Sequence, residues 1–114
     1  MSNENCIFCK IASGVIKLES VYEDGEFISF RDQNPQAPVH VLLIPKIHYN
    51  TFMDIDDEGL LGRALKAVQS SAVILGLAEG GFRTVLNTRD DGGQTVYHVH
   101  FHIMGGRFMQ WPPG

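Results

Sequence analysis

Histidine alternates with large apolar residues along residues 98–104, and this pattern restricts the possible fold more than any other stretch of the chain. In a strand, successive side chains point to opposite faces of the sheet. His98, His100 and His102 would therefore share one face, while the apolar residues between them would face a hydrophobic core. The pattern predicts a strand at residues 96–104 with a row of imidazoles on its accessible side.

Shorter patterns predict the remaining elements of an α+β domain. Helical spacing of apolar residues, β-branched runs, and Asp-Gly or proline signals locate them. The expected elements are a short helix at residues 6–13, a hairpin at 20–32 around Asp24-Gly25, and a loop at 33–38. A strand is expected in the apolar run at 39–46 and ends there at Pro45, and another strand is expected at 81–88. Together with one long helix, they predict a five-stranded antiparallel sheet that carries two helices.

The long helix is expected between the third and fourth strands. Asp54 is its expected N-cap, and Gly76 is expected to close its C-terminus. Its expected apolar stripe consists of Leu60, Leu61, Ala64, Leu65, Val68, Ala72 and Leu75.

Length and composition indicate one globular domain over residues 1–114. The chain has 44% hydrophobic and 19% charged residues, which is ordinary for such a domain. Its net charge of −4 argues against a nucleic acid polymer as partner, because such binding usually needs a strongly basic face. Residues 1–5 lack the parts of a signal peptide, and the apolar runs are too short to span a membrane. We therefore expect a cytoplasmic protein without membrane contact.

Three interpretations of the histidine row differ in their chemistry. A solvated strand face usually carries Thr, Lys, Glu or Ser, so three successive histidines are an unusual choice for it. A three-histidine metal site needs ligands that converge on one ion, whereas a row on one strand converges poorly. In nucleophilic catalysis, one neutral imidazole attacks while its neighbours orient it or bind an anion. We favour the catalytic interpretation.

The two cysteines of the chain, Cys6 and Cys9, form the segment Cys-Ile-Phe-Cys. In a reducing compartment this spacing indicates metal or redox chemistry more often than a structural disulfide. Two thiolates and two histidines from elsewhere would complete a tetrahedral zinc site. The alternative is a pair of half-buried thiols on one turn of a helix.

Several segments resemble the histidine triad family, and in particular its Hint-like nucleotide-binding branch. The stretch HVHFHIM matches the triad pattern of three histidines that alternate with apolar residues. The similarity covers residues 6–114 and includes CIFCKIASG, FRDQNPQAPVHVLLIPK, NTRDDGGQTVYHVHFH and the final GGRFMQWPPG. The resemblance implies a homodimer whose sheets join across the interface. The apolar tail at residues 105–114 is expected to pack there.

The resemblance also implies an enzyme that hydrolyses the P–N bond of purine nucleoside 5′-phosphoramidates through a nucleotidyl-histidine and binds AMP or GMP as product. Two other functions stay open. One is hydrolysis of dinucleoside polyphosphates, as in the Fhit-like branch, and the other is nucleotide-dependent regulation or scaffolding with incidental hydrolysis. Gln33 departs from the branch, which commonly has an apolar residue there, and it would add a hydrogen-bonding group at the rim of the base pocket.

Carried over by position, the resemblance implies a role for each residue of the site. His100 would be the nucleophile, with the His98 carbonyl orienting its ring and His102 donating to a phosphate oxygen. His40 would assist with the phosphate or with proton transfer. The ribose and phosphate would lie near Asp32, Asn87, Gly93, Gln94 and Thr95, and the base near Ile7, Phe8, Ile11 and Phe30.

The same resemblance extends to zinc. In some bacterial histidine triad proteins and in hexose-phosphate uridylyltransferases, a histidine after the IPK strand and the first triad histidine complete a site with two cysteines. The implied cofactor is one structural zinc ion, held by Cys6, Cys9, His48 and His98. The alternative is an apo protein in which His48 is a surface histidine.

Overall fold

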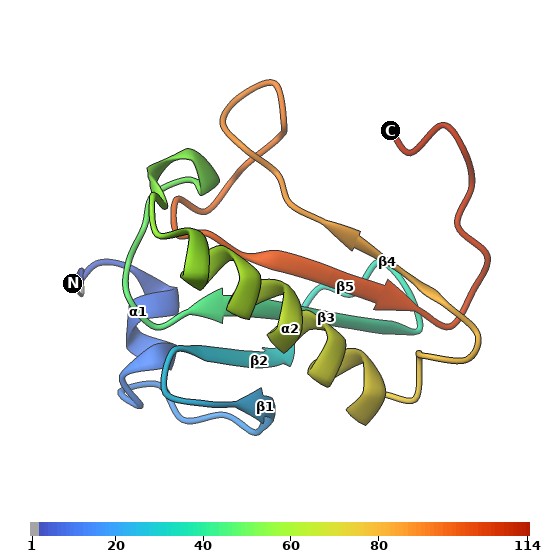
Figure 1. Ribbon diagram of the computed structural model, residues 1–114, viewed down its shortest axis with the longest axis horizontal. Helices are drawn as coiled ribbons and strands as arrows, with labels where there is room; N and C mark the ends of the chain where they lie inside the picture. The colour runs from blue at the N-terminus through green and yellow to red at the C-terminus, as the bar shows by residue number, and fades with distance from the viewer. Residues whose placement is uncertain (1–2) are drawn as a thin grey trace.

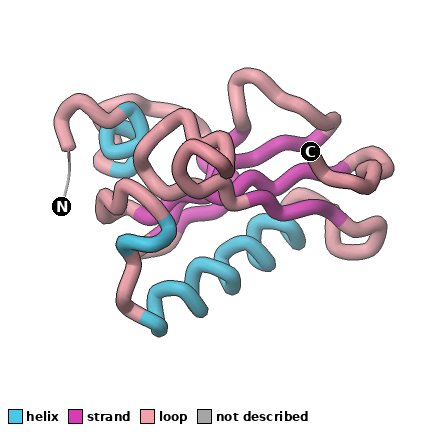
Figure 2. The backbone as a smooth tube through the Cα atoms, turned by 90° about the horizontal axis from the view of Figure 1, so that it is seen from above, coloured by secondary structure: helices cyan, strands magenta, loops and turns pink. Residues whose placement is uncertain are grey.

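A computed structural model describes residues 3–114, and it has the α+β architecture expected from the sequence. Five strands form one antiparallel sheet in the order β1-β2-β3-β5-β4. Helices α1 and α2 lie on opposite faces of this sheet (Figure 1; Figure 2). The bounds are α1 Ile7–Ala12, β1 Ser20–Glu23, β2 Phe27–Arg31, β3 Val39–Pro45, the 3-10 turn η1 Phe52–Asp54, α2 Glu58–Ile74, β4 Phe82–Val85 and β5 Phe101–Gly105.

The first two elements follow from local signals. The Cys6 Sγ accepts from the Cys9 backbone amide and caps the N-terminus of α1. The hairpin of β1 and β2 turns at the predicted Asp24-Gly25, where the Asp24 Oδ1 accepts from two backbone amides, those of Glu26 and Phe27. The carboxylate therefore closes the turn and fixes the pairing of the two strands.

Helix α2 begins later than expected but ends where expected. The predicted N-cap Asp54 is wrong, because α2 starts at Glu58 and Asp57 caps it through the Leu60 amide at 3.2 Å. Asp54 instead forms a capping box with Thr51 in η1. At the other end Gly76 has a φ of +73°, and the hydrogen bond from the Leu77 amide to the Ala72 carbonyl closes the helix.

The buried stripe of α2 is narrower than expected. Leu65 is 58% exposed, so its predicted place in the core is wrong, and Leu61 and Leu75 are only partly buried. Leu65 is about 140° around the helix from Leu60, which places it beyond the strip that the sheet covers. The buried residues of α2 are Leu60, Ala64, Ala67, Val68, Ser71 and Ala72.

The last strand is shorter than the predicted span of residues 96–104. Strand β5 starts at Phe101, so His98 and His100 lie in the irregular segment before it. Its pairing with β3 ends where Phe101 lies opposite Leu43, two residues before β3 itself ends at Pro45. The Val99 amide donates instead to the carbonyl of Tyr49, in the loop after β3. Strand β4 is likewise shorter than predicted and ends at Val85.

Two hydrophobic clusters fill the two faces of the sheet. One lies under α2 and includes Val99, Phe101 and Ile103, the apolar residues of the alternating segment. The other lies under α1 and includes Phe8 and Ile11. The alternation therefore directs the histidines toward the α1 side. No helix within residues 3–114 has the length and hydrophobicity that a membrane span requires.

Candidate active site and metal cluster

The His100 ring is held in one orientation by the backbone. Its Nδ1 lies 2.8 Å from the carbonyl oxygen of His98, and because a carbonyl only accepts, Nδ1 carries the hydrogen. The lone pair of a neutral His100 is therefore on Nε2. The ring is buried, contacts Phe8 edge-on at 5.2 Å between centroids, and lines a cavity of about 330 Å³. This arrangement presents an imidazole nucleophile to the cavity.

A chain of hydrogen bonds fixes the tautomer of His102 in the same way. The Gln36 backbone amide donates to Nδ1 of His40 at 2.9 Å, so the Nε2 of His40 carries the hydrogen. That Nε2 lies 2.9 Å from Nδ1 of His102, which accepts, and 3.4 Å from the carboxylate of Asp32. The hydrogen of a neutral His102 is therefore on Nε2. His102 also lines the cavity, where it supplies a donor beside the lone pair of His100.

Burial keeps the His40 and His102 imidazoles neutral. Desolvation, followed by the nearby His100 and His40, lowers the pKa of His102 to about 4, against a smaller opposing effect of Asp32. Desolvation also lowers the pKa of His40, although the Asp32 carboxylate raises it in part. At neutral pH both rings therefore have the tautomers derived above.

The lowered pKa of His102 predicts a loss of stability in acid. An unfolded histidine titrates near 6.5, so the unfolded chain binds this proton first and is stabilised relative to the folded chain as the pH falls from about 6.5 toward 4. We expect the urea midpoint to fall between pH 7 and pH 5, and to fall less in His102→Asn. Urea titrations of both proteins at the two pH values measure this difference. An equal fall in both would contradict the assigned pKa.

The cavity brings together residues that are distant in the sequence. It lies between α1 and the start of β5, and Phe8 and Phe30 meet edge-on at 5.9 Å in its wall. Its lining contains eight of the residues expected from the sequence, namely Ile7, Phe8, Ile11, Phe30, Asp32, Thr95, His100 and His102. Asp32 also accepts from the Asn34 amide, which fixes the turn that presents its carboxylate.

Five expected residues do not line the cavity: His40, Asn87, Gly93, Gln94 and His98. The Gln94 side chain is buried and bonded within the protein, since its Oε1 accepts from the Arg89 amide. Its Nε2 donates to the carbonyls of Asn50 and Val96. Gln94 thus holds the loop in place, and Gly93, with a φ of +75°, allows the chain to turn beside it.

Four residues line the cavity without having been predicted as site residues, namely Leu18, Arg31, Leu42 and Val96. A signal existed for Leu42, because it is two residues from His40 on β3 and pairs with His102 on β5. Strand periodicity therefore puts it on the same face as the histidine row. Leu18 comes from an irregular segment, and its position follows only from the folded chain.

A second cluster lies beside the first and joins residues from both ends of the chain. The Sγ of Cys6 is 3.3 Å from Nδ1 of His98, and the Sγ of Cys9 is 3.3 Å from Nδ1 of His48. The two Nδ1 atoms are 3.1 Å apart, and the four donor atoms all lie within 4.8 Å of one another. A tetrahedral zinc site with two sulfur and two nitrogen ligands has edges of about 3.3 to 3.8 Å. The four donors are therefore close to that geometry.

The outer nitrogens of the two histidines determine what faces the cluster. Nε2 of His98 donates to the Pro45 carbonyl at 2.8 Å, and Nε2 of His48 lies 2.7 Å from the amide oxygen of Asn50. Both Nδ1 atoms therefore direct lone pairs into the cluster, as metal-ligating histidines do. Burial raises the pKa of the Cys9 thiol and so favours the neutral thiol over the reactive thiolate. A cation bound among the four donors would favour the thiolate. It would also lie between the two Nδ1 lone pairs, whose nitrogens are 3.1 Å apart.

Known proteins resemble this chain in both sequence and fold. The sequence pattern of the HIT domain matches residues 13–109. Protein HitA of Neisseria gonorrhoeae is 48% identical over 104 residues, which cover 90% of this chain and 96% of HitA. Adenylylsulfatase HINT1 of Arabidopsis thaliana is 46% identical over 117 residues, which cover 99% of this chain and 79% of HINT1.

A solved structure extends the similarity to three dimensions. The HIT family hydrolase from Legionella pneumophila Philadelphia 1 superposes with a TM-score of 0.91 at 49% sequence identity, and the match covers 96% of this chain and 100% of that one. The likeness thus extends over nearly the whole length of both chains. On the strength of the matched domain, these identities and the shared fold, the chain belongs to the HIT family.

Proposed function

We propose that the protein hydrolyses the P–N bond of purine nucleoside 5′-phosphoramidates and releases AMP or GMP. The observation that supports this most directly is the 2.8 Å contact between His100 Nδ1 and the His98 carbonyl, which leaves the Nε2 lone pair free. The ring lines a largely apolar cavity whose volume of about 330 Å³ is within the range of small-molecule sites. A nucleophile beside an apolar slot suits a substrate with a base next to a reactive phosphorus.

The reaction proceeds in two displacements at phosphorus. In the first, Nε2 of His100 attacks the α-phosphorus, the P–N bond of the substrate breaks, and the nitrogen takes a proton from water and leaves as the amine. The nucleotide is then attached to Nε2 of His100. In the second, water attacks the same phosphorus, the bond to His100 breaks, and the nucleoside monophosphate leaves. His102 donates its Nε2–H to a phosphate oxygen as charge develops there, and His40 holds His102 in the required tautomer.

The remaining cavity residues suit the other two parts of a nucleotide. Ile7, Phe8, Ile11 and Phe30 form an apolar slot in which a purine is held by stacking and burial. The Asp32 carboxylate is an acceptor for the ribose hydroxyls, as carboxylates are in other nucleotide sites. We place Asn87, Gly93, Gln94 and Thr95 around the ribose and phosphate, with the Gln94 side chain acting through the loop it holds.

Relatives support the broader class of reaction. The Arabidopsis relative is named for action on an adenylyl sulfate, and the Legionella neighbour is described as a hydrolase. Both descriptions fit a nucleotidyl hydrolase. The phosphoramidate assignment narrows that class to nitrogen leaving groups.

A substrate panel tests this narrower assignment. We expect adenosine and guanosine 5′-phosphoramidates to be hydrolysed with a kcat/KM about 100-fold or more above that for dinucleoside polyphosphates. Product release followed by ³¹P NMR or chromatography measures both. Faster cleavage of dinucleoside polyphosphates would favour the Fhit-like activity. Nucleotide binding without turnover of any substrate would favour a regulatory or scaffolding role.

We further propose that Cys6, Cys9, His48 and His98 hold one structural zinc ion. The support is the near-tetrahedral spacing of the four donors and the two Nδ1 lone pairs that face them. Four protein ligands leave no open position, so the ion would stabilise the fold and take no part in the reaction. Thiols that bind zinc suit a reducing compartment, and we infer a cytoplasmic location.

A homodimer is the third part of the proposal. Strand β4 is an edge of the sheet, with one side unpaired within residues 3–114. Apolar residues that a partner would cover are exposed on α2, on β4 and in the tail, namely Leu65, Val73, Ile74, Phe82, Phe108 and Trp111. An edge strand beside such a surface suits a second copy of the chain, with the tail at residues 105–114 contributing to the interface.

Charge placed on this surface should separate the subunits. We expect light scattering to give twice the monomer mass for the wild type and the monomer mass for Val73→Asp combined with Ile74→Asp, because burying two carboxylates in an apolar interface is unfavourable. Val15→Asp is a matched control, since Val15 is equally exposed but follows α1. A wild type that is monomeric at all concentrations would contradict the dimer.

A further inference from the structure

Gln33 lies where two cavities meet. It follows Asp32 directly in the loop after β2, and its side chain is exposed. It lines the cavity that contains His100, and it also lines a neighbouring cavity of about 480 Å³ at the β1–β2 edge. The two cavities share Leu18, Phe30, Arg31 and Gln33 as walls. Gln33 is thus at the rim of the apolar slot described above.

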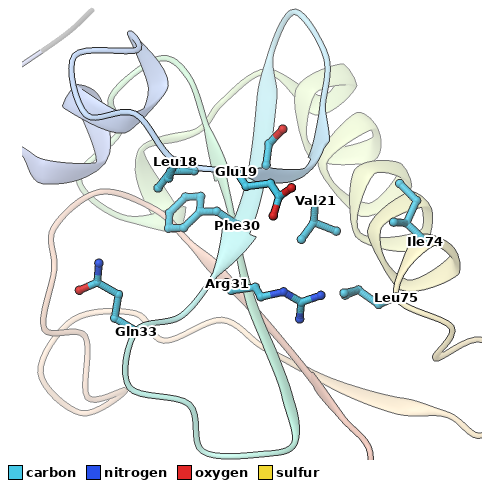
Figure 3. Close-up of a pocket in the computed structure, with 9 residues that line it drawn as sticks. Leu18, Glu19, Val21, Phe30, Arg31, Gln33, Ile74 and Leu75 are labelled. Atoms are coloured by element: carbon cyan, nitrogen blue, oxygen red, sulfur yellow. The ribbon is translucent and has the colours of Figure 1, made fainter.

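The two polar side chains on this shared wall point in different directions. Figure 3 shows Gln33 on the same side as Leu18 and the Phe30 ring, while the Arg31 side chain extends toward Leu75. This follows from strand geometry, because Phe30 and Arg31 are consecutive in β2 and face opposite sides of the sheet. Gln33 and Arg31 both line the cavity, but of the two only Gln33 has its side chain on the same side as the Phe30 ring.

The Gln33 amide is also free to bind a ligand. None of the hydrogen bonds among residues 3–114 involves its side chain, whereas Gln36 in the same loop bonds to the Asn34 carbonyl. The apolar walls of the slot that it borders are Ile7, Phe8, Ile11, Leu18, Phe30, Leu42 and Val96. A purine in this slot has its faces covered by apolar side chains, so its polar edge needs a partner at the rim.

We propose that Gln33 determines base specificity by hydrogen bonding to the polar edge of adenine. This inference rests on the proposed function. A primary amide presents a donor and an acceptor side by side, and adenine presents the complementary pair in its exocyclic amine and an adjacent ring nitrogen. An apolar residue at position 33 would contact the base but would form no hydrogen bond with that edge.

Binding of two product nucleotides tests the proposal. AMP and purine riboside 5′-monophosphate share ribose, phosphate and ring system, but only AMP has the exocyclic amine. We expect the wild type to bind AMP about threefold to tenfold more tightly, as expected for hydrogen bonds at a partly exposed rim. In Gln33→Leu that ratio should fall to about one, because leucine offers no acceptor to the exocyclic amine and Arg31, the other polar residue on the shared wall, carries only donors. Calorimetric titration measures both dissociation constants.

A glutamine on α2 provides the control. Gln69→Leu removes an exposed amide from a residue that lines neither of the two cavities, so this variant should keep the wild-type ratio. Gln33→Ala is the second variant, and it should behave as Gln33→Leu does. The same preference for AMP in Gln33→Leu and in the wild type would overturn the role of Gln33 while leaving nucleotide binding intact. A wild type that binds neither nucleotide would overturn this inference and the proposed function together.

Discussion

Replacing His100 with alanine is expected to lower phosphoramidate turnover by about four orders of magnitude or more while nucleotide binding persists. In the proposed reaction His100 supplies the atom that bonds to phosphorus, whereas we assign the affinity for a nucleotide to the apolar slot and Asp32. We expect the dissociation constant for AMP to change by no more than about threefold, because the ring is one wall of a larger cavity. Single-turnover kinetics and calorimetry measure the two quantities separately.

The intermediate gives a second readout for the same residue. Acid-quenched wild-type enzyme should contain a nucleotide attached to His100, detectable by peptide mass spectrometry, and the alanine variant should contain none. His102→Asn is a useful comparison, because it removes a donor to phosphate and leaves the nucleophile in place. Turnover at the wild-type rate in His100→Ala would refute the assignment of the nucleophile.

Loss of one thiol from the second cluster is expected to have the largest effect on stability. We expect Cys9→Ser to lose about one equivalent of zinc and to lower the free energy of unfolding by about 3 kcal/mol or more. For a domain of this size that corresponds to a drop of about 10 °C or more in Tm. Cys9 is the better choice for this test because the Sγ of Cys6 also caps α1. Metal analysis and calorimetry check the two effects.

Two controls assign this loss to the metal. A chelator should lower the Tm of the wild type and leave that of Cys9→Ser unchanged. His102→Asn should retain zinc, since His102 belongs to the neighbouring group of Asp32 and His40. Wild-type protein that is purified without chelator and has both thiols free and no stoichiometric metal would contradict the zinc site.

Elements set by local patterns could be predicted from the sequence, but their ends could not always be. The apolar run of β3 and the turn at Asp24-Gly25 depend on neighbouring residues, and both predictions are confirmed. The start of β5 depends on where the distant strand β3 stops pairing with it, at Leu43 opposite Phe101, and the strand pattern extends beyond that point. The exposure of Leu65 has a similar origin, because tertiary packing against the sheet decides which side of α2 is covered.

The site shows the same division between local and tertiary information. The spacing of the three histidines was enough to predict that they share one side of the chain. The spacing does not predict which histidines approach the cysteines, because Cys6 and His98 are 92 residues apart and Cys9 and His48 are 39 residues apart. Those partners came only from the resemblance to a family. The Gln94 side chain holds its loop in place partly by donating to the carbonyl of Asn50, and no local pattern predicts that contact.

His98 takes part in both clusters, but through different atoms. Its imidazole belongs to the cysteine cluster, whereas the group that fixes the His100 ring is its backbone carbonyl, which every amino acid possesses. A chain of this fold is therefore free to exchange both thiols and the first imidazole for packed side chains without losing the hydrogen bond on which the nucleophile depends. The proposed metal binding and the proposed chemistry are therefore separable traits in such a lineage, and selection is able to act on each alone.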